Sequence, residues 1–434
     1  MKNQFLFIYF LLFFVNILQA QKNINLKEAI ELGLKNRKDL QNLQINTQIT
    51  NNELEKIKTR NLPKVDASAD FRYNTQLQTN ILPAGAFGPE PTAVRFGTNF
   101  NNLIGVNATY DLYNPANLAD KKITLQNLEI DKATIQKSEI DIKNAITQAY
   151  YAILLNQEKL KYSEANIQRT QKYIEEGKIK LKEKSILQTD FDKLLLDNAN
   201  AQMVVEEDTK NLQLSKLYLS NQMGSEDNFN IAENLSDFMK NIDTNKIQKS
   251  IDNRIEIKQE QLKITQNQLN IDKQTRLGLP TLSLYGNFSV QNLSNNFEPF
   301  ASNVWFPFSY VGLKINASLF DGFLRKKTKN EFQLKTLQSQ NTISKLKNDY
   351  NYELQSAIVE MQNINQKIKN AQENIKLAES ILLIDNVRFK EGKINASELK
   401  NTEYSLQTAQ NNVLNLYYNF LMTELKYQKA VGEL

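Results

Sequence analysis

The most constraining feature of the sequence is a ladder of apolar residues that occurs twice, 208 positions apart. In each copy an apolar residue recurs every seven positions, which predicts a coiled-coil face on a long helix. The ladder residues are Ile146, Ile153, Leu160, Ile167, Ile174 and Leu181, and then Leu354, Met361, Ile368, Ile375, Leu382 and Phe389. The same offset relates Phe191 to Leu399 and Gly224 to Gly432. The chain is therefore one structural unit written twice.

The helix under the first ladder is expected to run from about Ala116 to Leu181. At about 1.5 Å per residue it is roughly 100 Å long, which exceeds what a single globular core can cover. Other long helices must therefore pack along its side. The heptads alone fit an ordinary dimeric coiled coil equally well, so the segments between the ladders decide the fold.

The chain has neither cysteine nor histidine among its 434 residues. This excludes disulfides, zinc sites built on these residues, and catalysis by imidazole or thiolate. Carboxylates alone could still catalyse a reaction, but the sequence shows no pocket signature for it. We therefore expect no enzyme, no cofactor, and no catalytic or metal-binding residue. The net charge of +5 is mild and spread out, which gives no reason to expect a nucleic acid partner.

Residues 1–20 have the pattern of a secretory signal peptide: Lys2, an apolar run from Phe5 to Val15, and a cleavage site ending at Ala20. An uncleaved membrane anchor is the alternative, although the apolar run is short for a membrane span. We expect export from the cytoplasm. Without cysteine there is no acceptor for an N-terminal lipid, and no later stretch is apolar enough for a transmembrane helix.

Each half opens with a helix that ends at a proline, Pro63 or Pro280, and the apolar period then changes to two. Four such stretches predict four strands in two hairpins, each strand with one apolar and one polar face. This is the pattern of a transmembrane β-barrel wall with lipid outside and water inside. Polar positions expected to face the lumen are Asp66, Asp70, Arg72, Asp111 and Lys314. A small soluble sheet with one solvated face is the alternative.

Aromatic residues near both ends of these strands suit two interfacial girdles. They are Tyr110, Tyr113 and Phe320 at one end, and Trp305, Phe306 and Phe308 at the other. Four strands cannot close a barrel, since the smallest bacterial barrels need eight. An open edge in lipid would leave unpaired backbone groups, so several copies must share one wall. The hairpin loops, the first of them long and rich in proline and glycine, are placed outside the cell.

The predicted organisation divides the chain at the repeat boundary. The segments are a signal peptide at 1–20, a first repeat at 21–224 with a β-hairpin at about 64–113 and a helical hairpin at about 116–224, a linker at 225–250, and a second repeat at 251–434 with a β-hairpin at about 281–320 and a helical hairpin at about 323–432. The fold class is thus mixed: long antiparallel coiled-coil helices together with a membrane β-barrel.

This order of elements resembles the TolC-like outer membrane efflux proteins, the outer membrane factors. The resemblance covers the mature chain and is most specific at Leu26–Leu32, Leu319–Gly322 and Arg388–Gly392. It implies a homotrimer in which twelve strands form one barrel in outer membrane lipid and twelve long helices form a periplasmic tunnel. Such a protein is a passive exit duct for small molecules or polypeptide in a tripartite efflux or type I secretion system.

The resemblance also implies partners: a periplasmic adaptor of the membrane fusion type and an inner-membrane pump of RND or ABC type. Candidate residues for adaptor contact lie in the two turns at the helical tips. They are Lys182, Glu183, Lys184, Lys390, Glu391 and Gly392. The alternative function is a non-channel periplasmic adaptor or structural spacer. An adaptor would ordinarily have one helical hairpin flanked by glycine-rich β-domains, whereas this chain has two hairpins and only 13 glycines.

In that family, acidic side chains just after the second tip turn form a cation-sensitive ring at a constriction. Aligned on Gly392, the first acidic position is Glu398, with Asp190 as its repeat partner, and the second is Asn401. Converging carboxylates attract cations, so Asn401 implies a less negative ring. The family's tip tyrosine, which forms a hydrogen bond in the closed state, corresponds to Phe389. A simpler explanation of Glu398 and Asp190 is the preference of helix starts for acidic residues.

Overall fold

The computed structural model describes residues 22–85, 88–225, 229–239, 250–301 and 304–434. These form two compact units. The helical unit consists of the chain up to Ile45 with Lys132–Gln259 and Thr342–Leu434, and the sheet unit consists of Asn46–Asp131 and Glu260–Asn341. The predicted signal peptide lies outside the described residues. No helix in the described part of the chain is both long enough and apolar enough to cross a membrane.

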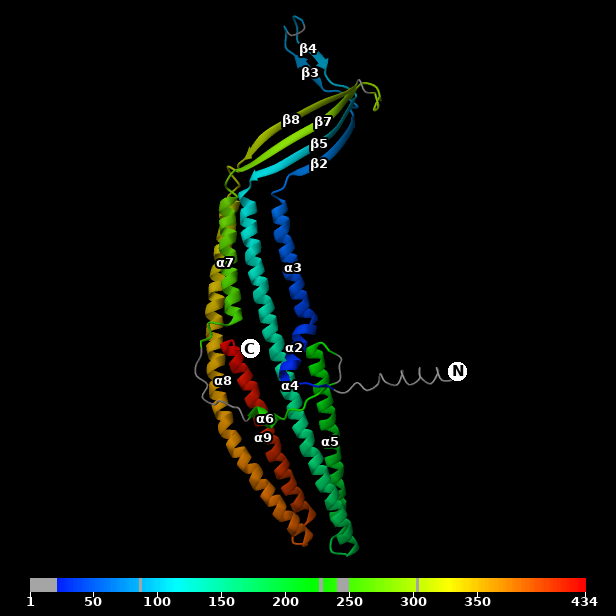
Figure 1. Ribbon diagram of the computed structural model, residues 1–434, viewed down its shortest axis with the longest axis vertical. Helices are drawn as coiled ribbons and strands as arrows, with labels where there is room; N and C mark the ends of the chain where they lie inside the picture. The colour runs from blue at the N-terminus through cyan, green and yellow to red at the C-terminus, as the bar shows by residue number, and fades with distance from the viewer. Residues whose placement is uncertain (1–21, 86–87, 226–228, 240–249, 302–303) are drawn as a thin grey trace, which may run out of the picture. The chain divides into compact units, whose positions relative to one another are not determined.

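The sheet unit is built on one four-stranded antiparallel sheet. Its strands are β2 (Lys64–Tyr73), β5 (Phe100–Tyr113), β7 (Thr281–Ser294) and β8 (Trp305–Asn316), in the order β2-β5-β7-β8 (Figure 1). Both predicted hairpins are present, and β5 pairs with β7 to join them. The second hairpin ends at Asn316, not near residue 320, because Asn316 pairs with Thr281 and the residue before Thr281 is a proline, which has no N–H to extend the ladder.

Two helices lie largely in the sheet unit, which also contains a small ribbon. The helices are α3 (Lys38–Thr59) and α7 (Ile255–Arg276), and the ribbon pairs β3 (Thr79–Leu82) with β4 (Thr92–Arg95). The ribbon lies in the long first loop, which the sequence presented only as rich in proline and glycine. Strands of four residues are too short for the alternation of apolar and polar residues to reveal them.

The register of the sheet separates an apolar face from a polar one. Residues directly opposite each other on neighbouring strands share a face, and Val65, Ala108, Gly286 and Val311 are opposite one another. On this apolar face large side chains are exposed, with Val311 at 80%. All five residues predicted to face a lumen, Asp66, Asp70, Arg72, Asp111 and Lys314, fall on the other face.

Side chains on the polar face bond across the strands. Asn287 donates to Asn107 at 2.8 Å, and Ser283 donates to Asp111 at 2.8 Å. The same register corrects one expectation about the aromatic residues. Phe306 is opposite Gln291 and Phe308 is opposite Ser289, so both share the polar face, and only Trp305 of that trio lies on the apolar one. The prediction of a lipid-facing girdle is wrong for those two residues.

The helical unit contains the two predicted helical hairpins. Its helices are α2 (Leu26–Asn36), α4 (Pro115–Lys182), α5 (Gln188–Met223), α6 (Leu235–Met239), α8 (Leu324–Lys390) and α9 (Ala396–Val431), of which α4 and α8 also contribute to the sheet unit. The ladder residues Ile146, Ile153 and Leu354 are completely buried. Their burial explains the heptad pattern, because these positions form the core between neighbouring helices.

The predicted linker has a little structure of its own. Its residues Phe229–Asn230 form β6, which pairs in parallel with β1 (Lys22–Asn23) beside the start of α2, and α6 follows. A capping box starts α2: the side chain of Asn25 accepts from the backbone N–H of Glu28, and the Glu28 carboxylate accepts from the backbone N–H of Asn25. Residues 240–249 of the linker lie outside the described residues.

Candidate functional site

The two turns at the helical tips have the same backbone geometry. Past the end of α4, Lys184 adopts a left-handed conformation (φ 57°), and Gly392 does so past the end of α8 (φ 74°). In each turn a backbone N–H bonds to the carbonyl oxygen five residues earlier, as in a Schellman motif, over 2.9 Å from Ser185 to Lys180 and over 2.8 Å from Lys393 to Arg388. The six residues named as candidates for adaptor contact, Lys182, Glu183, Lys184, Lys390, Glu391 and Gly392, are all exposed.

The first turn is the weaker of the two. A lysine in the left-handed region is strained by its Cβ, whereas glycine is not. The side chain of Asn395 caps α9 by accepting from the backbone N–H of Glu398 at 3.0 Å, whereas the equivalent Leu187 gives α5 no side-chain cap. The second turn therefore has both favourable residues and the first has neither.

Replacing Lys184 with glycine is expected to stabilise the helical unit by about 0.5–1 kcal/mol, because it relieves the left-handed strain. Gly392→Ala, at the equivalent position, is expected to destabilise it by a similar amount. Urea unfolding followed by far-UV circular dichroism measures both changes. A lower stability for Lys184→Gly would show that the left-handed lysine is held by contacts of its own.

The residues assigned to the constriction lie at the starts of the return helices. Glu398 is exposed in the first turn of α9, where its carboxylate accepts from the Asn395 side chain at 3.3 Å, and Asn401 follows one turn later, also exposed. Asp190 is in the first turn of α5, paired with Lys193 at 3.2 Å. Both acids are therefore in places that a helix dipole favours, and their hydrogen-bonding partners Lys193 and Asn395 are local ones. Their ring remains a prediction.

Phe389 is a buried contact between the two hairpins, only 1% exposed. Its ring lies edge-on to Tyr173 of α4, with the centroids 6.3 Å apart, and the Lys180 ammonium is 4.6 Å from its centroid. The same ammonium donates a hydrogen bond to the Phe389 carbonyl oxygen. The hydroxyl in this cluster thus comes from Tyr173, and the two hairpins are joined here without a tyrosine at position 389.

A buried ion pair next to this cluster was missed by reasoning from the sequence. Glu403 of α9, 5% exposed, accepts from Arg169 of α4 at both carboxylate oxygens, at 2.8 and 2.9 Å, and from the Tyr173 hydroxyl at 2.8 Å. Burial, and then the Glu403 charge, raises the pKa of Tyr173, so its phenol remains a donor. Because both oxygens of Glu403 already accept hydrogen bonds, the group is suited to joining helices and not to a reaction.

A signal for this pair was present in the repeat. At the equivalent positions the other copy has leucine, Leu377 for Arg169 and Leu195 for Glu403. Where one repeat has a charged residue and the other repeat has an apolar residue at the equivalent position, the two repeats make different contacts there. The pairing itself could not be predicted, since the partners are 234 residues apart.

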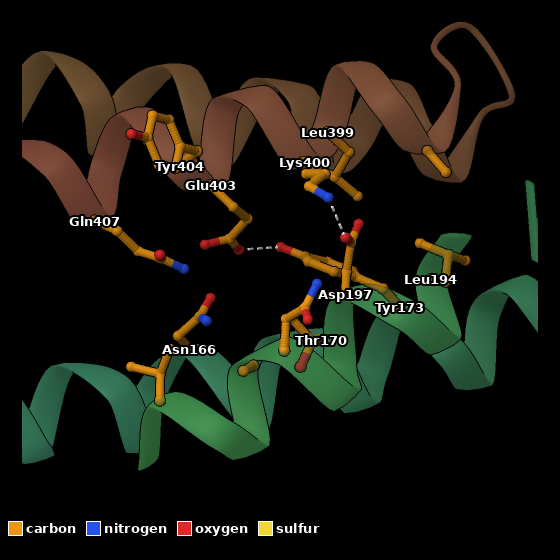
Figure 2. Close-up of a pocket in the computed structure, with 14 residues that line it drawn as sticks. Asn166, Thr170, Tyr173, Leu194, Asp197, Leu399, Lys400, Glu403, Tyr404 and Gln407 are labelled. Carbon is orange, nitrogen blue, oxygen red and sulfur yellow. Dashed lines mark hydrogen bonds and ion pairs between the residues drawn. The ribbon is translucent and has the colours of Figure 1, made fainter. Parts of the chain in front are cut away.

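A cavity of about 180 Å³ lies beside the Arg169–Glu403 pair, between α4, α5 and α9. Figure 2 shows Glu403 reaching across it to Tyr173, and Lys400 of α9 meeting Asp197 of α5, over 2.6 Å. Asn166 points into the same space, and its buried side-chain oxygen has no hydrogen-bond partner among the described residues. The cavity therefore has a partly polar lining and lies where α9 covers the groove between α4 and α5.

The chain is similar to known proteins over both of its repeats. A family model described as outer membrane efflux protein matches residues 29–181 and 246–433. No curated protein is significantly similar in sequence. Solved structures with the same fold include CusC (16% identity, 96% of this chain and 95% of that one, TM-score 0.75). The outer membrane channel CmeC of Campylobacter jejuni (17%, 94% and 85%, 0.72) and the open MtrE channel of Neisseria gonorrhoeae (13%, 95% and 94%, 0.70) are also similar.

Proposed function

Since the chain belongs to the outer membrane efflux protein family, we propose that three copies of it form one exit duct, with a shared barrel and a shared helical tunnel. Members of this family are outer membrane efflux channels and not enzymes. We further propose that this homotrimer is exported by a signal peptide and works with two partner proteins. Those partners are a periplasmic adaptor at the helical tips and an inner-membrane pump of RND or ABC type, in an efflux or type I secretion system.

The observation that carries the proposal is the isolated four-stranded sheet. Its apolar face has exposed side chains on every strand, and its outer strands β2 and β8 each have one edge that no strand of the described chain pairs. In lipid each unpaired backbone group is unfavourable by several kcal/mol, and bacterial barrels have at least eight strands. Three such sheets supply twelve, with β8 of one copy pairing with β2 of the next.

The polar face of the sheet supports a water-filled bore with little selectivity. Asp66, Asp70 and Asp111 are negative there, whereas Arg72 and Lys314 are positive. Mixed charges around a wide opening favour neither sign of cargo, so the choice among small molecules or polypeptides falls to the pump. Export by the signal peptide at residues 1–20, without lipid attachment, completes the proposal.

The alternative is a periplasmic spacer or adaptor that works without a channel. A spacer in water has no use for an apolar sheet face with Val311 at 80% exposure. The test is to purify the mature protein from outer membranes and examine its migration with and without heating, then to insert it into a planar bilayer. We expect a heat-modifiable trimer that conducts ions. A water-soluble monomer without conductance would overturn the proposal.

Removal of the Glu398 carboxylate is expected to weaken the preference of the channel for cations. A carboxylate about 6 Å from a cation in water contributes roughly 0.7 kcal/mol. Glu398→Ala removes one carboxylate from each of three copies, about 2 kcal/mol in all, so it should lower the ratio of cation to anion permeability by up to roughly thirtyfold. Asn401→Asp should raise it, and Asn401→Ala, which changes no charge, is the control. Reversal potentials in a salt gradient measure the ratio. If neither Glu398→Ala nor Asn401→Asp shifts it, the ring assignment fails.

A further inference from the structure

The helical unit contains the groove beside α4 a second time. A groove of about 570 Å³ lies between α8 and α9. Every residue that α4 and α5 contribute to the first cavity, from Asn166 to Val204, has its repeat partner among the residues lining the second groove, from Asn374 to Asn412. The two are therefore one site, made once by each repeat.

The two grooves differ in what covers them. Leu399, Glu403 and other residues of α9 close the groove between α4 and α5 (Figure 2). The groove of the second repeat is lined by α8 and α9 alone within the described chain. The repeat partner of the covering helix α9 is α5, but no α5 residue of the same chain lines the second groove. The helix that completes the pattern has to come from a second copy.

In each groove, the residue in the groove and the residue on the covering helix have matching chemistry. This match is expected if both grooves bind a helix in the same way. At the first site Arg169 in the groove pairs with Glu403 on the covering helix. At the second site the groove position is Leu377, which is 61% exposed, and the position on α5 is Leu195, which is 43% exposed. Tyr173 likewise becomes Ile381. A change on one side alone would leave a charge against an apolar side chain, whereas the paired change keeps each contact complementary.

We propose that α5 of one copy docks in the groove between α8 and α9 of the next copy, with Leu195 packed on Leu377 and Ile381. No charged side chain lines that groove, which suits an apolar occupant. The inference rests on the homotrimer of the proposed function and assigns the residues of its tip interface. Two kinds of contact between helical hairpins then alternate around the ring. The contact within each chain is the Arg169–Glu403 ion pair with the Tyr173 hydroxyl, and the contact between chains is apolar.

Cross-linking tests the contact directly, because the natural chain has no cysteine. In trimers of the Leu195→Cys/Leu377→Cys variant, a short bismaleimide is expected to link neighbouring copies into dimers and trimers that persist on a denaturing gel. The control is Met203→Cys/Leu377→Cys: Met203 is on the same helix and 60% exposed, but its repeat partner Asn411 does not line the first cavity. A trimer in which Leu195 and Leu377 are not linked, or are linked within one chain, overturns the docking. If the natural protein forms no trimer, the proposed function itself fails.

A charge transplant tests the same contact by energetics. Leu195→Glu is expected to weaken trimer association roughly 10- to 100-fold, because a carboxylate is buried without a partner. Adding Leu377→Arg should restore it, since this rebuilds the Arg169–Glu403 pair between copies. Met203→Glu is the control and should gain nothing from Leu377→Arg. Circular dichroism of each variant separates loss of assembly from loss of folding. Wild-type association of Leu195→Glu, or no rescue by Leu377→Arg in a folded protein, overturns the proposal.

Discussion

Truncation of Glu403 to alanine is expected to destabilise the helical unit by about 2–4 kcal/mol. Removing one partner of a buried ion pair is strongly unfavourable because it leaves the other charge uncompensated, and here both Arg169 and Tyr173 lose their acceptor. The value lies toward the lower part of the usual range because the Arg169 side chain remains 25% exposed and can reach water. Urea unfolding followed by circular dichroism measures the loss.

The matched control copies the other repeat. Arg169→Leu/Tyr173→Phe/Glu403→Leu replaces the ion pair with the leucines found at 377 and 195, and it removes the hydroxyl that would otherwise lose its acceptor. It is expected to fall within about 1 kcal/mol of the natural protein, because exchanging a buried ion pair for apolar residues is often neutral. With Arg169→Leu and Glu403→Leu, each made together with Tyr173→Phe, it forms a double-mutant cycle that isolates the pairing energy. A triple variant as unstable as Glu403→Ala would mean that this position needs the charges.

An arginine in the middle of β2 is expected to have opposite consequences on the two faces of the sheet. Ala67 lies on the apolar face, opposite Val106, and Ser68 lies on the polar face, opposite Gly105. Near the middle of a bilayer a lipid-facing arginine costs about 2–4 kcal/mol, so Ala67→Arg should sharply reduce folding into lipid vesicles. Ser68→Arg should fold normally, because its side chain would lie in water.

Ala67→Arg and Ser68→Arg control for each other because they change adjacent residues of β2. Both side chains are exposed in the single chain and are neighbours on the same strand, so the two variants place the same arginine in the same strand and differ mainly in the face that it occupies. The folded fraction is measured as the heat-modifiable form after transfer from urea into vesicles. Equal losses for Ala67→Arg and Ser68→Arg would mean that neither face of the sheet contacts lipid, and the barrel proposal would have to be abandoned.

Much of the fold was predictable from the sequence because it depends on local periodicity and on the repeat. The heptad ladder led to α4 and α8, and Pro63 and Pro280 marked where helices give way to strands. The face of the sheet on which each aromatic side chain lies was harder to predict. In the stretch from Trp305 to Phe308 three aromatic residues stand around a proline, so composition alone does not tell which of them faces lipid, and only the pairing with β7 decides it.

The candidate site divides in the same way. The tip turns were found because a glycine and the end of a ladder are local signals, and Gly392 and Lys184 occupy equivalent places in them. The resemblance drew attention to position 389 as the site of a hydroxyl, and the structure instead buries a phenylalanine there against Tyr173. The Arg169–Glu403 pair depends on a tertiary contact between different hairpins. The sequence shows this pair only as a difference between the two repeats, whereas the repeat itself was identified from their similarities.

The two open edges of the sheet have a consequence for how the protein reaches its membrane. A copy that has not yet assembled presents the open edges of β2 and β8 to any extended chain it meets, and exposed strand edges promote aggregation in this way. If the unpaired backbone groups of these two strands can form hydrogen bonds only with other copies, barrel formation depends steeply on the local protein concentration. If three copies share one barrel as proposed, their assembly competes with aggregation, and shielding each copy until two others have bound it would raise the yield.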